Sequence, residues 1–265
     1  MGVKTILSLE DLKKIFPSYG FIKILPTSSG IIDTTYIVYT KTASYILKKY
    51  ERNIPRKIVL DAQLLKQLNS AGLNVPLCLG KNDGWHLYTR LTGEQPRTIK
   101  SYHIQAVARF LAKLHCATSK NICDSNVMIE DEVTDALKYT KLHHFSYYKK
   151  FEFLKHFSHE DAVLIHGDIF KDNTIFNHKK VGVIDFIDSS CGTLSFDAAV
   201  TLVGFDARTH HDYFINIFLN AYNQHAPKKL TKKVVKEKMK IAAHFYALKR
   251  VYTYKNTLRA KELLR

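Results

Sequence analysis

Short runs of β-branched and aromatic residues follow one another over the first 90 residues and predict a small antiparallel sheet. The runs are FIKIL, TTYIVYT, SYILKKY, VPLCLG and WHLYTRL, and their composition is typical of strands. A short polar stretch around Lys41 joins the second run to the third, and Asp83-Gly84 lies between the last two. Turn residues between strand-like runs predict β-hairpins, so we expect two hairpins in this part of the chain.

Helical periodicity occurs at two places in the first 90 residues, one before the strand-like runs and one between them. Ser8 with Asp11 resembles a capping box that opens a short helix. The apolar face of that helix is formed by Leu9, Leu12, Ile15 and Phe16. The stretch KIVLDAQLLKQLNSAG predicts a second helix, which we expect to end at Gly72. Its apolar positions are Leu60, Leu64, Leu65 and Leu68.

Helical patterns dominate the rest of the chain. SYHIQAVARFLAKLHCA predicts a helix, residues 131–159 are expected to be helical with loops, and the chain from Ser195 onward is expected to be helical. AVLIHGDIF and KVGVIDFID predict short strands or strand-like loops. We therefore predict an α+β fold with two lobes and a cleft. Residues 1–90 form a small N-terminal lobe with an antiparallel sheet and a helix, and residues 91–265 form a larger, mainly helical C-terminal lobe.

Composition places the chain among ordinary globular proteins. Its 265 residues are 46% hydrophobic and 24% charged, and no apolar run approaches the length of a membrane span. The first residues contain no apolar segment long enough for a signal peptide. The cysteines, Cys78, Cys116, Cys123 and Cys191, are scattered without a C-x-x-C pair, which favours reduced thiols over disulfides or a zinc site. We therefore expect a soluble, cytoplasmic protein that does not associate with membranes.

The net charge of +16 raises the question of a nucleic-acid partner. Residues 227–265 carry 13 Lys and Arg against two Glu, a net of +11. The same segment has apolar residues at helical spacing, namely Val235, Met239, Ala242, Ala243 and Tyr246. This pattern predicts an amphipathic helix with a cationic outer face, and no nucleic-acid motif accompanies it. Nucleic acid is therefore not the expected partner.

Candidate chemistry is concentrated in the stretch IHGDIFKDNTIFNHKKVGVIDF. Asp168, Asn173 and Asp185 stand there among apolar neighbours, and buried carboxylates are costly unless a cation meets them. Carboxylate and amide oxygens suit Mg²⁺, which also binds substrate phosphates. A metal, a phosphate and a base are the parts that phosphoryl transfer requires.

These residues also carry a family resemblance. HGDIFKDN resembles the catalytic loop H-x-D-x-x-x-x-N of protein-kinase-like phosphotransferases, and VIDF looks like their metal-binding Asp-Phe element. Gly167 and IDF point to the branch that contains aminoglycoside phosphotransferases, choline kinases and type II homoserine kinases. The resemblance implies a protein-kinase-like bilobal fold with ATP and Mg²⁺ as cofactors. It also implies that Asp168 is the catalytic base and that Asn173 and Asp185 are the Mg²⁺ ligands.

Further motifs imply the nucleotide contacts. YILK resembles the strand whose Lys, here Lys48, contacts the α- and β-phosphates, and Ile46 on the same face would lie against adenine. Asp61 stands where the family has a Glu that pairs with this Lys. SSGIIDTTY, with Gly30, is similar to the phosphate-covering turn, and LYTRLTGEQP, with Leu91, is similar to the adenine-binding hinge. The resemblance thus assigns nucleotide binding to the N-terminal lobe, and catalysis and substrate binding to the C-terminal lobe.

Other polar residues have structural interpretations. FDAAV resembles a structural Asp segment of the family, so Asp197 is expected to be a buried orienting residue. His166 is expected to position the catalytic loop, and His115 to be a core histidine without chemistry. Asp188 is open between a substrate contact and a turn, and Lys171 between a phosphate contact and a solvated side chain.

The segments SGIIDTTYIVYT and AAHFYALKR look most like type II homoserine kinases, although the family's N-T-N-Y is here Asp33-Thr34-Thr35-Tyr36. The resemblance implies an ATP- and Mg²⁺-dependent phosphotransferase acting on a hydroxyl of a small molecule, with homoserine or a related amino alcohol as best candidate. Choline, ethanolamine and aminoglycosides are alternative acceptors, and a non-catalytic nucleotide-binding protein is the alternative of another class. The sequence leaves the acceptor, the choice between ATP and GTP, and the oligomeric state open.

Overall fold

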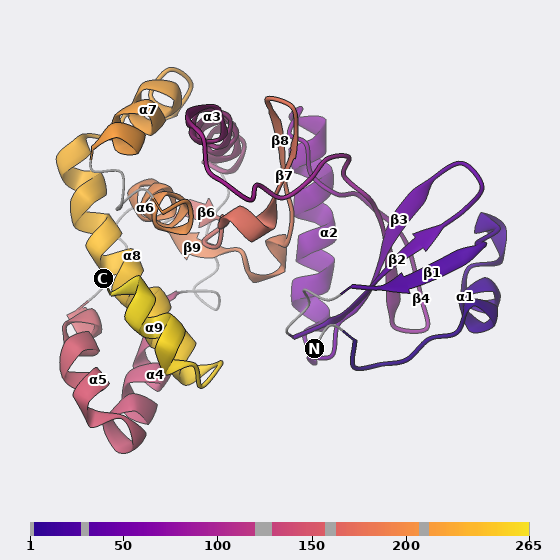
Figure 1. The fold of residues 1–265 in the computed structure, drawn as a ribbon, viewed down its shortest axis with the longest axis horizontal. Helices are drawn as coiled ribbons and strands as arrows, with labels where there is room; N and C mark the ends of the chain where they lie inside the picture. The colour runs from indigo at the N-terminus through magenta and orange to yellow at the C-terminus, as the bar shows by residue number, and fades with distance from the viewer. Residues whose placement is uncertain (1–2, 28–31, 120–128, 157–162, 207–211, 265) are drawn as a thin grey trace. The chain divides into compact units, whose positions relative to one another are not determined.

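The computed structural model describes residues 3–27, 32–119, 129–156, 163–206 and 212–264 (Figure 1). The chain divides into two compact units, Met1–Gly93 with Gly182–Ile187, and Glu94–Val181 with Asp188–Arg265. This division differs from two consecutive lobes in one respect, because the short segment that contains Asp185 belongs to the first unit.

A five-stranded antiparallel sheet forms the centre of the first unit, with the strand order β1-β2-β3-β5-β4. The strands are β1 (Lys23–Pro26), β2 (Thr34–Tyr39), β3 (Ser44–Lys49), β4 (Cys78–Asn82) and β5 (Trp85–Thr89). Both predicted hairpins are present. Asp83 and Gly84 connect β4 to β5 with φ angles of 49° and 74°, as a two-residue hairpin turn requires.

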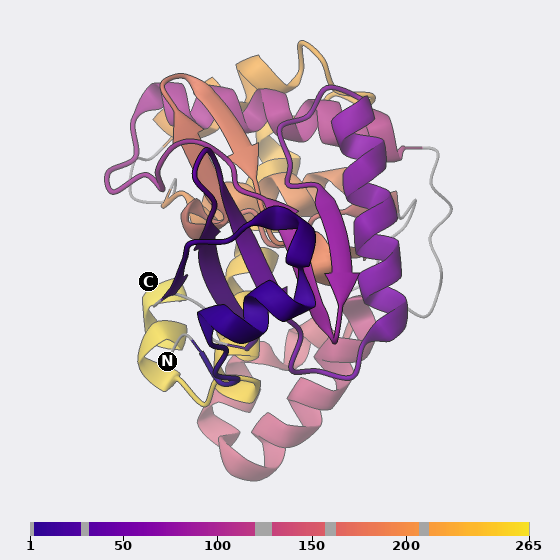
Figure 2. The same ribbon diagram turned by 90° about the vertical axis from the view of Figure 1, so that its right-hand side faces the viewer.

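Apolar residues from the sheet and from α1 (Leu9–Ile15) form the core of this unit, and Figure 2 shows α1 across one face of the sheet. The core residues are Leu12, Phe16, Phe21, Tyr36, Val38, Leu47, Trp85 and Leu87. Ser8 caps α1 as predicted, because its hydroxyl accepts the Asp11 N–H at 3.1 Å. The short 3₁₀ helix η1 (Pro17–Tyr19) follows α1.

The second helix of this unit, α2 (Pro55–Ser70), buries three of the four predicted apolar positions, Leu64, Leu65 and Leu68. Its buried residues are Asp61, Leu64, Leu65 and Leu68. Leu60 is 46% exposed, so its place in the predicted apolar face is wrong. The buried set follows the i, i+3, i+4, i+7 spacing of a single helical stripe, and that stripe begins at the carboxylate of Asp61. Gly72 follows the helix with φ of 80°, as predicted for its end.

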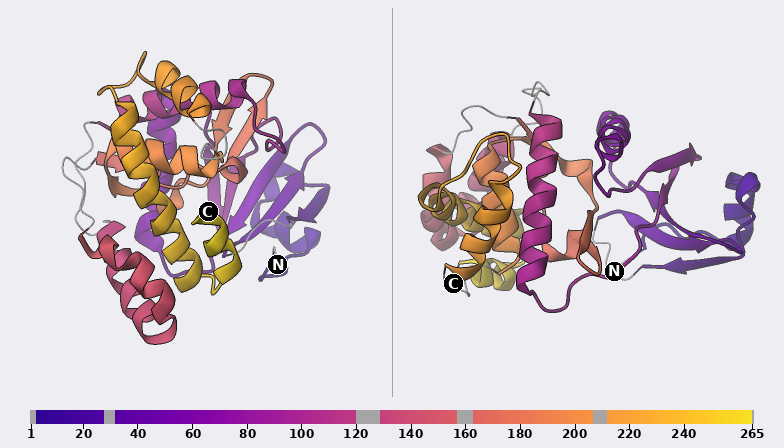
Figure 3. Two further views of the ribbon diagram at one scale, coloured as in Figure 1. Left: turned by 60° about the vertical axis from the view of Figure 1, so that its left-hand side comes forward. Right: turned by 90° about the horizontal axis from the view of Figure 1, so that it is seen from above.

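Helices dominate the second unit. They are α3 (Ser101–Thr118), α4 (Ile129–His143), α5 (Phe145–Phe151), α6 (Leu194–Gly204), α7 (Tyr213–Tyr222), α8 (Lys232–Tyr252) and α9 (Thr257–Leu263). Helix α8 packs across α6, and α3 packs along α7 (Figure 3). The five apolar positions predicted for the basic helix are all buried in α8, which confirms that its lysines face outward from an apolar stripe.

Short elements lie between these helices. They are η3 (Glu152–His156), η4 (Lys171–Asn173), η5 (Phe186–Asp188), and two two-stranded sheets, β6 (Val163–Ile165) with β9 (Ser190–Gly192) and β7 (Thr174–Asn177) with β8 (Lys180–Val183). The catalytic-loop sequence follows β6, and the Asp-Phe element follows β8. The α+β class predicted from the sequence is thereby confirmed.

The thiols differ in part from expectation. Cys78 and Cys116 are free, whereas Cys191 is disulfide-bonded. The prediction of reduced thiols is therefore wrong for Cys191, because spacing along the chain does not reveal which distant residues the fold brings together. No helix in the described part of the chain has both the length and the apolarity needed to cross a membrane.

Candidate active site

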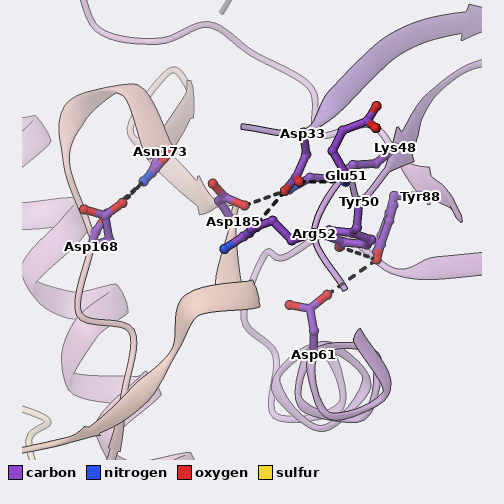
Figure 4. Close-up of polar contacts among 10 residues, drawn as sticks. All are labelled: Asp33, Lys48, Tyr50, Glu51, Arg52, Asp61, Tyr88, Asp168, Asn173 and Asp185. Carbon is purple, nitrogen blue, oxygen red and sulfur yellow. Dashed lines mark hydrogen bonds and ion pairs between the residues drawn. The ribbon is translucent and has the colours of Figure 1, made fainter. Parts of the chain in front are cut away.

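Lys48 on β3 makes the central ion pairs of the first unit. Side chains alternate along a strand, so Leu47 points into the core while Ile46 and Lys48 share the other face. The Lys48 ammonium donates to Asp185 Oδ1 at 2.9 Å and lies 4.0 Å from Asp33 Oδ2 (Figure 4). The structure thus brings together Lys48 and Asp185, two of the residues that the sequence selects.

The charge of Lys48 results from two opposing effects. Burial lowers the pKa of its ammonium, whereas neighbouring carboxylates, foremost Asp185, raise it. The carboxylates prevail, so the pKa of Lys48 lies above its ordinary value. Lys48 is therefore cationic at neutral pH, as a contact with phosphate oxygens requires.

Asp33 is a member of this network that sequence reasoning missed. Its carboxylate is 7% exposed and accepts from Arg52 Nη2 at 3.2 Å and from the Glu51 N–H at 3.1 Å. These bonds hold the carboxylate beside Lys48. The available signal was the departure from N-T-N-Y, which places an acidic residue at the start of β2.

Asp61 has other partners. The Tyr88 hydroxyl donates to Asp61 Oδ2 over a long 3.5 Å, and the Tyr50 and Tyr88 hydroxyls are 2.9 Å apart (Figure 4). Burial and the charge of Asp61 raise the pKa of Tyr88, so its hydroxyl stays protonated and can donate. The implied Lys48–Asp61 ion pair is not formed, because the short carboxylate reaches the tyrosine while Asp33 lies beside Lys48.

A pair of double-mutant cycles tests this arrangement. We expect the effects of Lys48→Ala and Asp61→Ala on kcat/KM for the nucleotide to combine additively, within about twofold, because the two groups share no direct bond. We expect Lys48→Ala and Asp33→Ala to be non-additive, since removal of either one breaks the same interaction. Steady-state kinetics of the three single and two double variants measure both couplings. A strong Lys48–Asp61 coupling would restore the role that the family resemblance gives to Asp61.

The backbone presents Asp185 in an unusual conformation. Its φ is 68°, a left-handed value that costs roughly 1–2 kcal/mol for most residues and that Asp tolerates better than most. The strand before it is fixed, because the Val183 N–H donates to Asn74 O at 3.1 Å. Gly182 is also required there, since a Cβ would come within 2.6 Å of side-chain atoms of Asn74 and Leu91. Such strain is typical of functional positions.

In the second unit, Asp168 and Asn173 are held to each other. Asn173 Nδ2 donates to the Asp168 backbone oxygen at 2.8 Å and to its Oδ2 at 3.1 Å (Figure 4). The Asp168 N–H donates to His166 Nδ1 at 3.2 Å, which confirms that His166 positions the loop. The spacing of five residues therefore brings the predicted base and the predicted amide ligand into one hydrogen-bonded pair.

The buried carboxylate of Asp197 anchors the loop that carries Asp168. Asp197 accepts the N–H groups of His166 and Gly167 at 3.0 and 2.9 Å, and it is fully buried, as expected of an orienting residue. His115 Nε2 lies 3.1 Å from Asp197 Oδ2, and His115 Nδ1 lies 2.7 Å from the Tyr222 hydroxyl. Burial alone would raise the pKa of Asp197, but hydrogen bonds from His115 and Gly167 lower it overall. The carboxylate stays ionised, and His115 therefore supports the loop through Asp197.

Four further residues selected from the sequence remain to be placed. Gly30 lies outside the described residues. Leu91 is half-buried and packs against Gly182. Lys171 is exposed, and its Nζ lies 3.8 Å from Asp206 Oδ2. This contact favours a solvated side chain over a phosphate contact. Asp188 is half-buried at the end of η5.

Comparison with known proteins identifies the family. Residues 23–228, well over half of the chain, match the phosphotransferase enzyme family. The chain belongs to this family. It is a small-molecule phosphotransferase. A homoserine kinase from Bradyrhizobium diazoefficiens is 24% identical over 257 residues, which cover 84% of this chain and 78% of that protein.

Solved structures of other family proteins share the fold of this phosphotransferase. A choline kinase from Cryptosporidium parvum superposes with a TM-score of 0.67 at 16% identity, covering 95% of this chain and 90% of its own. An amicoumacin kinase solved with AMP-PNP and Ca²⁺ gives a TM-score of 0.65 at 15% identity, covering 96% and 85%. At these identities the likeness establishes the fold alone.

The donor atoms of this phosphotransferase suit a hard divalent cation. Asn173 uses its Nδ2 for Asp168, which leaves its Oδ1 without a hydrogen bond among the described residues. Asp185 is 43% exposed. No group of three or more His, Cys, Asp or Glu able to hold a metal occurs in the described part of the chain. Amide and carboxylate oxygens of this kind suit Mg²⁺, which also takes oxygen ligands from phosphates and water.

Proposed function

We propose that this protein is an ATP- and Mg²⁺-dependent kinase that phosphorylates the hydroxyl of a small amino alcohol, with homoserine as the preferred acceptor. The observation that carries the catalytic part is the Asp168–Asn173 pair on a loop anchored by buried Asp197. This anchoring holds the Asp168 carboxylate in a defined orientation, as a general base needs.

In the proposed reaction, Asp168 accepts the proton of the acceptor hydroxyl. The hydroxyl oxygen then bonds to the γ-phosphorus, and the bond from that phosphorus to the ADP oxygen breaks. Asn173 holds the Asp168 carboxylate through its Nδ2, so the carboxylate does not have to be ordered during the reaction.

Lys48, Asn173 and Asp185 would bind the cofactors. Lys48 is a half-buried cation suited to phosphate oxygens, and Asp185 and Asn173 each offer an oxygen ligand to Mg²⁺. When bound, the metal neutralises charge on the β- and γ-phosphates. Ile46 on the Lys48 face and Leu91 are proposed to lie against adenine. The amicoumacin kinase solved with AMP-PNP and Ca²⁺ supports a nucleotide and a divalent cation in this fold.

The acceptor assignment rests on the curated relatives. Homoserine kinases from Bradyrhizobium diazoefficiens and Zymomonas mobilis cover 84% and 79% of the chain at 24% and 26% identity. The net charge of +16 also disfavours polycationic acceptors such as aminoglycosides. Choline, a single cation that aromatic side chains can bind, is the strongest competitor.

A panel of acceptors tests the proposal. ADP release is measured with ATP and Mg²⁺ in the presence of homoserine, choline, ethanolamine, kanamycin or a fructosamine. We expect the highest kcat/KM with homoserine and the lowest with kanamycin. Faster turnover of choline or kanamycin would overturn homoserine as the preferred acceptor and leave the kinase assignment in place. Nucleotide binding that needs no Mg²⁺ in a thermal-shift experiment, together with no ADP release, would favour the non-catalytic alternative.

A further inference from the structure

Helix α8 is fixed against the catalytic loop through Tyr246. The Tyr246 hydroxyl donates to the Gly167 carbonyl, and its ring meets Phe170 edge to face with centroids 4.8 Å apart. Phe170 in turn lies on Gly204, where a Cβ would come within 2.8 Å of the Phe170 Cα. Tyr246 thus contacts Gly167, just before Asp168, and Phe170, just after it. These two contacts fix α8 against the loop that carries the proposed base.

Arg250 lies one helical turn beyond Tyr246 on the same side of α8, about 6 Å further along the axis. Its guanidinium lies over the ring of Tyr254, 5.0 Å from the centroid. The chain turns back just after the helix, because the Asn256 N–H donates to the Arg250 carbonyl at 2.9 Å. Arg250 is half-buried, so this stacking holds its planar group in one orientation.

Two carboxylates of the proposed active site act on Tyr254. Burial is the main cause that raises the pKa of Tyr254, and the negative charges of Asp168 and Asp188 raise it further against the opposing charges of Lys249 and Arg250. Arg250 lies one helical turn from Tyr246, whose hydroxyl contacts the residue before the proposed base.

Arg250 has no carboxylate partner in the described part of the chain. Among the residues that the structure describes, no carboxylate lies within ion-pair distance of its guanidinium, whereas Arg52 pairs with Asp33 and Arg259 pairs with Glu262. A half-buried arginine held by stacking, with its donors unpaired, is suited to bind a carboxylate through two parallel hydrogen bonds.

We propose that Arg250, held in place by Tyr254, binds the carboxylate of the acceptor and makes the enzyme select amino-acid alcohols over alcohols that lack a carboxylate. This inference rests on the proposed function and adds to it a specificity-determining residue. Homoserine carries its carboxylate three bonds from the carbon that bears the hydroxyl, so in this proposal one molecule contacts Arg250 through its carboxylate and Asp168 through its hydroxyl.

The test compares homoserine with 3-aminopropan-1-ol, which is homoserine without its carboxylate. Hydrogen bonds to charged groups contribute about 1.5–3 kcal/mol, so we expect Arg250→Ala to lower kcat/KM for homoserine by about 10- to 100-fold, mainly through KM. The value for 3-aminopropan-1-ol and the KM for ATP should stay within about twofold. Arg250→Lys should recover part of the loss, because a point charge remains without the planar fork.

Arg259→Ala is the matched control, because it removes one positive charge from the same C-terminal region at an exposed side chain paired with Glu262. It should leave kcat/KM unchanged for both homoserine and 3-aminopropan-1-ol. Equal losses for both acceptors in Arg250→Ala, or a raised KM for ATP, would overturn the role of Arg250 and leave homoserine as the acceptor. A wild-type enzyme that prefers 3-aminopropan-1-ol or choline to homoserine would overturn both proposals.

Discussion

Replacement of Asp168 by Asn is expected to lower kcat by about 10²- to 10⁴-fold, the usual cost of removing a general base. The amide has nearly the shape of the carboxylate, and the loop keeps its anchors at Asp197, so the fold and nucleotide binding should persist. The amide is unable to accept the hydroxyl proton. ADP release at saturating acceptor measures kcat, and a thermal shift with Mg²⁺-ATP measures nucleotide binding.

Asp172→Asn is the matched control for this variant. Asp172 is an exposed acid in the same loop, and its backbone carbonyl, which accepts from Gln95, is unchanged by the substitution. We expect it to retain wild-type kcat. An Asp168→Asn enzyme with wild-type kcat would show that the hydroxyl proton leaves by another route and that the base assignment is wrong.

Features set by local chemistry were predictable from the sequence. The Asp83-Gly84 hairpin, the Ser8 cap and the stop at Gly72 each depend on a few neighbouring residues. The Asp168–Asn173 pair belongs to the same class, because five residues of loop connect the two groups and their hydrogen bonds close that loop.

Features that depend on distant elements were not predictable. Asp61 meets Tyr88 instead of Lys48 because the rotation of α2 and the register of β5 together decide which groups face each other. Asp33 occupies its place beside Lys48 because Arg52 and the Glu51 N–H, from beyond β3, hold its carboxylate. The disulfide at Cys191 likewise joins residues that sequence spacing does not relate.

The position of α8 illustrates the same limit within the site. Periodicity predicted its buried apolar face, including Tyr246, and the structure confirms that face. Periodicity does not reveal that the Tyr246 hydroxyl reaches the Gly167 carbonyl, a contact across 79 residues. Without that contact, the sequence gives no reason to connect Arg250 with Asp168.

Asp185→Ala is expected to raise the Mg²⁺ concentration required for half-maximal nucleotide binding by at least about 10-fold, because the metal loses its carboxylate ligand. Lys48 keeps Asp33 at 4.0 Å in this variant, so one carboxylate remains beside its ammonium. Asn173→Ala should act in the same direction more mildly, since it removes a neutral ligand. Nucleotide binding titrated with Mg²⁺ measures the midpoints.

The backbone conformation of Asp185 requires a control of its own, because Ala tolerates φ of 68° poorly and could destabilise the protein without any metal effect. Asp83→Ala provides it: Asp83 is exposed, lies in the same unit and has φ of 49°. Both variants should lose similar stability, by up to about 1–2 kcal/mol, and only Asp185→Ala should shift the Mg²⁺ midpoint. Equal midpoints in Asp185→Ala and Asp83→Ala would exclude Asp185 as a ligand, and its carboxylate would then act only as the partner that keeps Lys48 charged and in place.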